Sequence, residues 1–220
     1  MSTKDTCKEI SQQTLKRLPY YLNYLSQLKN EGVTNVASPQ IAEILGYNEI
    51  QIRKDLASVS STPGRPKMGF AVYDLIDDIE NFLGYRNTND AILIGVGSLG
   101  RALLGYKGFG SYGLNIAAAF DCDESKVGVE VDGKIVFSMD KLQDLCRRLN
   151  IHIGIITVPA DNAQKACNIL IESGIKAIWN FAPIRLKVPE GILVQNENMA
   201  ESLALLSQHL KQQCQTGQEE

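Results

Sequence analysis

Residues 95–100 read Gly-Val-Gly-Ser-Leu-Gly, which is the spacing of a loop that binds a dinucleotide. The loop directly follows the apolar run Ala-Ile-Leu-Ile and leads into a helical sequence. The glycines of such a loop make a tight turn, let a pyrophosphate approach the backbone and allow close packing of helix on strand. Free amides at the helix N-terminus favour the charge of the pyrophosphate. This context favours nucleotide binding over a purely structural turn. The predicted contacts are Gly95, Val96, Gly97, Ser98, Leu99 and Gly100.

Asp121 ends the next apolar run and lies 21 residues beyond Gly100. An acidic residue at about this spacing binds the hydroxyls of the adenine ribose. Because Cys122 and Asp123 follow it, and not an arginine, the residues favour NAD over its phosphorylated form. The alternative is that Asp121 caps the strand end and faces solvent.

Two later strand ends are further candidates, because ligands of parallel sheets bind beyond the carboxyl ends of the strands. Residues 157–160 read Thr-Val-Pro-Ala, and residues 180–183 read Asn-Phe-Ala-Pro. The asparagine and phenylalanine could contact a nicotinamide amide and ring. The alternatives are an ordinary strand-to-helix turn for the first segment and a core phenylalanine in the second. The predicted contacts are Thr157, Val158, Pro159, Asn180, Phe181, Ala182 and Pro183.

A second kind of chemistry is indicated by residues 51–56, Gln-Ile-Arg-Lys-Asp-Leu. An amide, a guanidinium and an ammonium near the start of a helix are suited to reading base edges or holding phosphates. The alternative is a solvated helix face in which Arg53 and Lys54 pair with Asp55 or Glu49, and Ser38 could equally be a helix N-cap. The predicted DNA contacts are Ser38, Gln40, Gln51, Arg53, Lys54, Arg65 and Lys67.

The first part of the chain contains the elements that would position these side chains. Apolar residues between 9 and 30 recur at helical spacing and predict one helix, or a pair broken near Pro19. Ser38 and Pro39 predict a short helix that ends at Gly46, and Asn48 predicts a cap for the next helix, with Gln51 reaching back. Residues 60–70, rich in proline and glycine, would form the wing, and residues 72–83 return to a helix. This order predicts a winged helix-turn-helix domain.

From residue 91 the pattern becomes α/β. Apolar runs at 91–95, 114–120, 151–158, 177–180 and 191–194 predict strands, with helices at 99–106, 140–149, 161–173 and 198–213 between and after them. Strands that alternate with helices predict a parallel sheet of the Rossmann type. We divide the chain into a winged-helix DNA-binding domain at 1–84, a Rossmann NAD(H)-binding domain at 85–197 and a C-terminal dimerisation helix and tail at 198–220.

Composition limits the class of protein. The 220 residues are 44% hydrophobic and 21% charged, and no apolar run approaches membrane-spanning length, so we expect no membrane partner. The N-terminus has no apolar stretch behind a basic start, which predicts a cytoplasmic protein. The five scattered cysteines form no Cys-x-x-Cys pair, so we expect neither a disulfide framework nor a metal site. Residues 1–69 carry nine Lys and Arg against six Asp and Glu, a balance that permits DNA binding.

Several segments together, in this order and over nearly the whole chain, resemble the family of redox-sensing transcriptional repressors called Rex. They are KRLPYYLNYL, QIRKDL, GVGSLGRALL, AAAFDCDESKVG, TVPA, AQKA and IWNFAPIRLKVP. The resemblance implies a homodimer that exchanges its C-terminal helix and binds a palindromic operator when NADH is scarce. It also implies that NADH, bound at residues 95–100, Asp121 and the two strand-end turns, releases the DNA.

The chain departs from the family's pattern in the wing, which reads ASVSSTPGRPKMGF instead of ending in a KRGVGY-like sequence, and at Ser98, where asparagine is common. Tyr106 matches an interface tyrosine of the family, but Asn23 and Asn198 stand where its arginine and aspartate partners are expected. Met199 stands where an aromatic residue often contacts the nicotinamide pocket of the partner subunit. We therefore expect Tyr106, Asn198 and Met199 to contribute to a dimer interface. We also expect the contacts that couple nucleotide binding to DNA binding to differ from those of the family.

Two other classes of protein compete with a redox-sensing repressor. An NAD-dependent oxidoreductase would need a substrate domain, for which little chain is left, and a general base, which neither His152 nor His209 resembles. We therefore predict that the chain is not an enzyme. A module that binds CoA or another metabolite would explain the glycine loop but would leave the helix-turn-helix unexplained.

Overall fold

The computed structural model describes residues 10–65, 68–86 and 89–216, without the side chains of 214–216. The chain divides into two compact units, Met1–Asn87 and Thr88–Glu220, and each is described by itself. Lys67, a predicted DNA contact, lies outside the described residues, as does Cys7.

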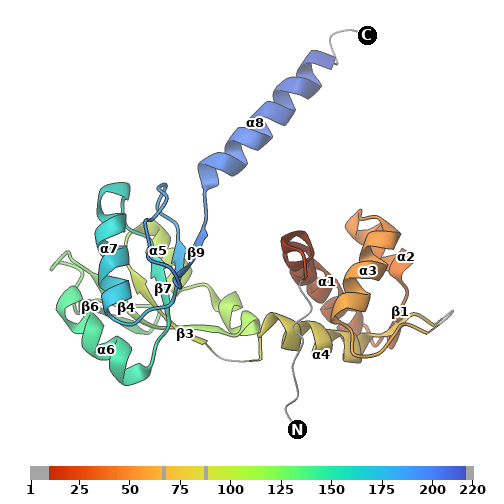
Figure 1. Ribbon diagram of the computed structural model, residues 1–220, viewed down its shortest axis with the longest axis horizontal. Helices are drawn as coiled ribbons and strands as arrows, with labels where there is room; N and C mark the ends of the chain where they lie inside the picture. Colours follow the sequence, from red (N-terminus) through yellow and green to blue (C-terminus); the bar gives the residue numbers. More distant parts are fainter. Residues whose placement is uncertain (1–9, 66–67, 87–88, 217–220) are drawn as a thin grey trace. The chain divides into compact units, whose positions relative to one another are not determined.

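The N-terminal unit has the element order of a winged helix (Figure 1). Its elements are α1 (Gln12–Asn30), β1 (Asn35–Val36), α2 (Ser38–Leu45), α3 (Glu49–Val59), β2 (Phe70–Ala71) and α4 (Val72–Leu83). The strands β1 and β2 pair antiparallel, and a single bridge between Arg65 and Gly69 marks the hairpin of the wing. The prediction of a winged helix-turn-helix is confirmed.

Helix α1 is continuous, so the alternative of a pair broken near Pro19 is wrong. The hydroxyl of Ser11 caps the helix by accepting from the backbone N–H of Thr14 at 3.1 Å. The helices pack around a core in which several side chains have no exposed surface. These include Leu18, Tyr21, Leu25, Ile41, Ile52, Leu56 and Ile79.

Two predictions about helix caps need correction. Ala37, and not Ser38, occupies the N-cap position of α2, and Ser38 is the first helical residue, 7% exposed. Asn48 does cap α3, since its Oδ1 accepts from the N–H groups of Ile50 and Gln51 at 2.9 and 3.4 Å. The side chain of Gln51, however, does not reach back to the cap and bonds within α3.

The C-terminal unit is built on a seven-stranded sheet in the order β5-β6-β4-β3-β7-β8-β9. All neighbouring strands are parallel except β5 and β6. The first half of the unit comprises β3 (Asn89–Ile94), α5 (Ser98–Leu104), the 3-10 helix η1 (Lys107–Tyr112), β4 (Leu114–Asp121), β5 (Glu130–Val131) and β6 (Lys134–Ser138). The second half comprises η2 (Met139–Lys141), α6 (Leu142–Leu149), β7 (Ile153–Ile156), α7 (Ala160–Glu172), β8 (Ala177–Asn180), β9 (Leu193–Asn196) and α8 (Met199–Thr216).

Both faces of this sheet are covered, which confirms the Rossmann-type prediction. On β3, Ile92 and Ile94 face a core shared with α6 and α7, which lie on one side of the sheet (Figure 1). Ala91 and Leu93 face the opposite core, which includes Leu104 of α5. Successive strand residues point to opposite faces, so a strand that is covered on both sides reads as a continuous apolar run.

The β5–β6 hairpin was not predicted. Asp132 and Gly133 form its turn with φ angles of +48° and +76°, and Asp-Gly is a strong hairpin signal. At the other end of the unit, every described side chain of α8, residues 199–213, is exposed. No helix in the part of the chain that the structure describes has the length and apolar character needed to cross a membrane.

Candidate functional site

The glycine loop joins β3 to α5, and its three glycines meet different surroundings. Gly95 has a φ of +99°, and a Cβ there would lie 2.7 Å from Val158 Cγ1. A Cβ on Gly100 would lie 2.1 Å from the carbonyl oxygen of Gly95. A Cβ on Gly97 would meet nothing within 4 Å. The first and third glycines are therefore required by packing, whereas the second leaves open space against the backbone, as the approach of a pyrophosphate requires.

The Thr-Val-Pro-Ala turn holds this loop in place. Thr157 Oγ1 lies 2.7 Å from the carbonyl oxygen of Gly95 and 3.0 Å from that of Ile94. The backbone N–H of Thr157 also donates to the oxygen of Ile94 at 2.9 Å. Because β7 is the parallel neighbour of β3, the turn that ends β7 lies beside the loop that ends β3. The turn therefore supports the loop.

Asp121 lies at the end of β4 and is only 6% exposed, so the alternative of a solvent-facing strand cap is wrong. Its carboxylate accepts from the backbone N–H groups of Val96 at 2.7 Å and Asp123 at 3.0 Å. The Nζ of Lys126 donates to it at 3.1 Å. Burial raises the pKa of Asp121, but the hydrogen bonds from Asp123, Lys126 and Val96 outweigh it and leave the pKa below its ordinary value. An ionised acceptor therefore stands directly beside the glycine loop.

Lys126 was missed by the sequence analysis. The chemistry of Asp121 could have pointed to Lys126, because a buried carboxylate requires a nearby cation or several hydrogen-bond donors. The signal could be used only once the burial of Asp121 was known.

A cavity of about 180 Å³ opens at the carboxyl ends of β3 and β4. Its lining combines apolar side chains with the carboxylate of Asp121, which is the character expected of a pocket for a small molecule. The lining residues are Ile94, Gly95, Asp121, Cys122, Met139, Val158, Asn162, Lys165, Ala166 and Ile169. The cavity therefore lies beside the glycine loop, with Gly95 and Asp121 in its lining.

The side chain of Asn180 does not fit the role of nicotinamide contact. It is fully buried, and its Nδ2 donates to the carbonyl oxygen of Ile184 at 2.9 Å and to Asn196 Oδ1 at 2.9 Å. Its Oδ1 accepts from the backbone N–H of Ala182 at 3.0 Å. The amide is engaged within the chain and shapes the Asn-Phe-Ala-Pro turn, so in this structure it contributes as a positioning residue.

In the N-terminal unit, the carboxylate of Asp55 is 2% exposed, so the alternative that Asp55 lies on a solvated face and pairs with Arg53 or Lys54 is wrong. Arg17 donates to it from Nε at 2.7 Å and from Nη2 at 3.0 Å. Tyr21 Oη and Thr14 Oγ1 donate at 2.8 and 3.1 Å. Gln51 Nε2 donates at 2.9 Å. The signal was present, because Asp55 lies on the apolar stripe of its helix, between the positions of Ile52 and Leu56.

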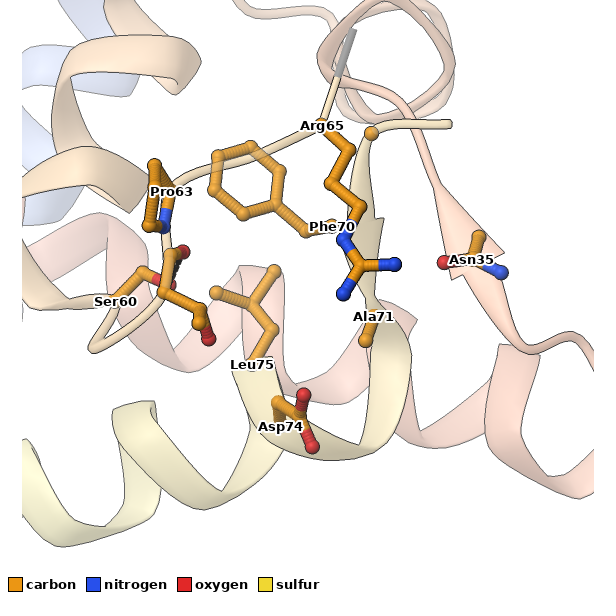
Figure 2. Close-up of a pocket in the computed structure, with 10 residues that line it drawn as sticks. Asn35, Ser60, Pro63, Arg65, Phe70, Ala71, Asp74 and Leu75 are labelled. Atoms are coloured by element: carbon orange, nitrogen blue, oxygen red, sulfur yellow. Dashed lines mark hydrogen bonds between the residues drawn. The ribbon is translucent and has the colours of Figure 1, made fainter. Parts of the chain in front are cut away.

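The other predicted DNA contacts lie in varied surroundings. Arg53 is exposed and pairs with Glu49 one turn earlier, as the alternative reading expected. Lys54 is also exposed, whereas Gln40 Oε1 accepts from the N–H of Ala37 at 2.9 Å and so caps α2. Figure 2 shows Arg65 beside β2, where it lines a pocket with Asp74 over the side chains of Phe70 and Leu75.

Metal ligands and disulfides were not expected. Within residues 10–65, 68–86 and 89–216, no three His, Cys, Asp or Glu side chains form a group that could hold a metal ion. Cys122, Cys146 and Cys167 are free thiols. Burial raises the pKa of Cys146 to about 11 and also raises that of Cys167, so both thiols stay protonated at neutral pH.

A repressor of Bacteroides fragilis named "Redox-sensing transcriptional repressor Rex" is 42% identical over 207 residues, which cover 94% of this chain and 93% of the relative. The chain belongs to the Rex family. The Rex protein of Porphyromonas gingivalis strain ATCC 33277 is 41% identical over 92% of this chain and 93% of its own length. The resemblance seen in the sequence is confirmed.

Solved Rex-family structures match both units. The structure described as "RSP in complex with beta-NAD+ and operator DNA" is 33% identical, with a TM-score of 0.88 and coverage of 96% of each chain. The structure of RSP in complex with beta-NADH has a TM-score of 0.84 and covers 96% of this chain and 99% of that one. The family model described as a CoA binding domain matches residues 86–184, and one described as a putative DNA-binding protein N-terminus matches residues 9–57.

Tyr106 lies at one end of a row of aromatic side chains. Tyr106 is 51% exposed and packs edge-on against Phe109, with ring centroids 4.8 Å apart. Phe109 packs on Trp179 at 5.8 Å, and Trp179 packs on Phe181 at 4.9 Å. A row of aromatic rings therefore connects the Asn-Phe-Ala-Pro turn to Tyr106.

At the residues where the chain departs from the Rex pattern, α8 begins. Asn198 Oδ1 accepts from the N–H groups of Ala200 at 3.1 Å and Glu201 at 3.3 Å, so Asn198 is the N-cap of α8. Met199 is 66% exposed, and Asn23 is exposed on α1. An asparagine keeps the cap that an aspartate would also supply, without its charge.

Proposed function

We propose that this chain is a homodimeric repressor that binds palindromic operator DNA and is released when NADH occupies its Rossmann unit, so that it responds to the NADH/NAD ratio. The observation that carries the proposal is the glycine loop, in which Gly97 faces open space and Val96 donates to the buried Asp121. The same chain carries a winged helix with exposed basic residues on α3. Relatives solved with NAD, with NADH and with operator DNA support the combination.

Discrimination between the two nucleotides requires no reaction. The oxidised nicotinamide ring carries a positive charge and the reduced ring is neutral, so an apolar pocket favours NADH because desolvating a cation is costly. The partly buried rings of Phe181 and Trp179 supply such surroundings beside the turn that ends β8. No hydride moves in this scheme, and we infer that the chain acts as a sensor and not as an enzyme.

The binding of NADH and the binding of DNA are coupled if each ligand prefers a different arrangement of the dimer. NADH must bind the DNA-free arrangement more tightly than the DNA-bound one, and DNA must then weaken NADH by the same factor. Two recognition helices of a dimer must meet half-sites about one helical turn, or a multiple of it, apart. We place this protein in the cytoplasm, where DNA and NADH are both present.

We infer that α8 forms the dimer by exchange with a second copy, since it exposes a row of large apolar side chains. Met199, Leu203, Leu206 and Leu210 lie at helical spacing, and each is 59–66% exposed. Such a row is typical of a surface that another apolar surface covers.

Replacing Leu206 by glutamate is expected to convert the dimer to a monomer, because a charge would have to be buried in an apolar interface. Light scattering after gel filtration measures the mass. Gln208, on the opposite side of α8, gives the matched control, since Gln208→Glu adds the same charge and leaves the dimer intact. A Leu206→Glu protein of dimer mass would contradict the role of α8.

The test of the function is fluorescence anisotropy of a labelled palindromic operator at fixed salt, because salt sets the affinity scale of DNA binding. NADH is expected to release the DNA, and NAD at the same concentration is not. If neither nucleotide changes the affinity, the two units are uncoupled and the proposal fails. A parallel titration with CoA tests the CoA-binding alternative, which predicts release by CoA and none by NADH.

A further inference from the structure

The exposed face of α3 includes a large apolar side chain that was not among the predicted DNA contacts. Four exposed residues follow the spacing i, i+3, i+4 and i+7, and therefore share one side of the helix. They are Ile50, Arg53, Lys54 and Ala57. Two cations thus lie between two apolar side chains.

Ile50 is 61% exposed, whereas Ile52, two residues later, is fully buried in the core of the N-terminal unit. Asn48 caps the helix by accepting from the backbone N–H of Ile50 at 2.9 Å, which places Ile50 in the first turn. Ile50 is therefore a large apolar side chain in the first turn of the helix, held away from the core.

Gln51, the amide that the sequence favours as a base reader, is occupied elsewhere. Its Nε2 donates to Asp55 Oδ1 at 2.9 Å, and Asp55 is held in turn by Arg17 and Tyr21. Releasing the amide of Gln51 would remove one donor from a buried carboxylate, which is costly. The N-terminal turn therefore presents Ile50 beside Arg53 and Lys54, while the amide of the exposed Gln51 is turned toward Asp55 by this hydrogen bond.

We propose that Ile50 is a specificity-determining residue that contacts the C5-methyl group of a thymine in the major groove. The inference rests on the proposed function, because it requires that α3 lies in the groove of operator DNA. Residues at the N-terminal end of a recognition helix contact base edges. Thymine is the only base that presents an apolar group in the major groove. The cations at Arg53 and Lys54 place this apolar contact next to contacts with guanine or phosphate.

The geometry also limits where the thymine lies. Ile50 and Arg53 are separated by about 4.5 Å along the helix axis at 1.5 Å per residue. Base pairs are stacked about 3.4 Å apart. The thymine is therefore expected within about two base pairs of the base or phosphate that Arg53 contacts.

The test uses the full-length protein and a duplex that the wild type has selected from random sequences. Each thymine is replaced in turn, symmetrically in both half-sites, by deoxyuridine, which lacks only the methyl group. We expect one position at which the substitution weakens wild-type binding about fourfold per half-site. This is the loss of affinity expected when one buried methyl-sized group is removed from the interface. Ile50→Ala is expected to bind the thymine and deoxyuridine duplexes equally at that position.

Ile44 of α2 provides the matched control, since it is 62% exposed in the same unit. Ile44→Ala should keep the wild-type sensitivity to deoxyuridine. The inference is overturned if the wild type binds the duplex but ignores every deoxyuridine, or if Ile50→Ala stays sensitive at the same position. If the wild type selects no duplex at all, the proposed function fails, and that result is distinct from both.

Discussion

Replacing Gly97 by alanine should weaken NADH binding about tenfold to a hundredfold while the C-terminal unit stays folded. The backbone of Gly97 is extended, with φ −83° and ψ −165°, so alanine fits without strain. A Cβ would meet no protein atom within 4 Å and would instead occupy the space next to the loop. A pyrophosphate held off by one methyl group loses at least one hydrogen bond to a charged group, worth about 1.5–3 kcal/mol.

Gly100→Ala is the informative comparison. Its Cβ would lie 2.1 Å from the carbonyl oxygen of Gly95, a backbone atom that Thr157 also holds. The loop must therefore shift, and we expect this variant to lose both NADH binding and thermal stability. Calorimetric titration measures binding, and the fluorescence of Trp179, the only tryptophan, reports unfolding of the C-terminal unit. Wild-type NADH affinity in Gly97→Ala would rule out this loop as the pyrophosphate site.

Replacing Asp55 by alanine should destabilise the N-terminal unit by about 3–5 kcal/mol, the range for breaking a buried ion pair from one side. The substitution leaves the guanidinium of Arg17, which is 16% exposed, and the hydroxyl of Tyr21 without their acceptor. Far-UV circular dichroism follows the loss of helix during urea unfolding. Glu49→Ala, which removes the exposed partner of Arg53 on the same helix, should cost no more than about 1 kcal/mol. Equal losses in the two variants would contradict a special role for Asp55.

The same carboxylate gives the stability a dependence on pH. Burial raises the pKa of Asp55, but the hydrogen bonds from Arg17 and its other partners outweigh it, so the folded pKa is below the ordinary value. The unfolded chain has a pKa of about 3.9. Above that pH the stabilisation is fully present, and it is lost as the pH falls through the lower folded pKa. As the pH falls from 5 to below the folded pKa of Asp55, the free energy of unfolding of the wild type should approach that of Asp55→Ala. A difference between the two proteins that stays constant over this range would contradict the role of Asp55.

Local signals in the sequence were sufficient for most of the helices and strands and for the glycine loop, although not for the β5–β6 hairpin. Asn48 caps α3, apolar runs form strands β3, β4, β7, β8 and β9, and residues 95–100 connect a strand to a helix. These features depend on residues within a few positions of one another, so the chain itself carries the information. The resemblance to Rex rests on the same short segments.

Tertiary structure decided which polar groups remain available to a ligand. The sequence predicts roles for Gln51 and Asn180 from their residue types, but both amides bond to groups within the chain. Likewise Thr157 supports a loop 62 residues earlier, and Arg17 reaches Asp55 38 residues later. The physical reason is that a buried carboxylate or amide must find its partners in space. Sequence spacing does not define those partners until strands β3 and β7, or helices α1 and α3, lie side by side.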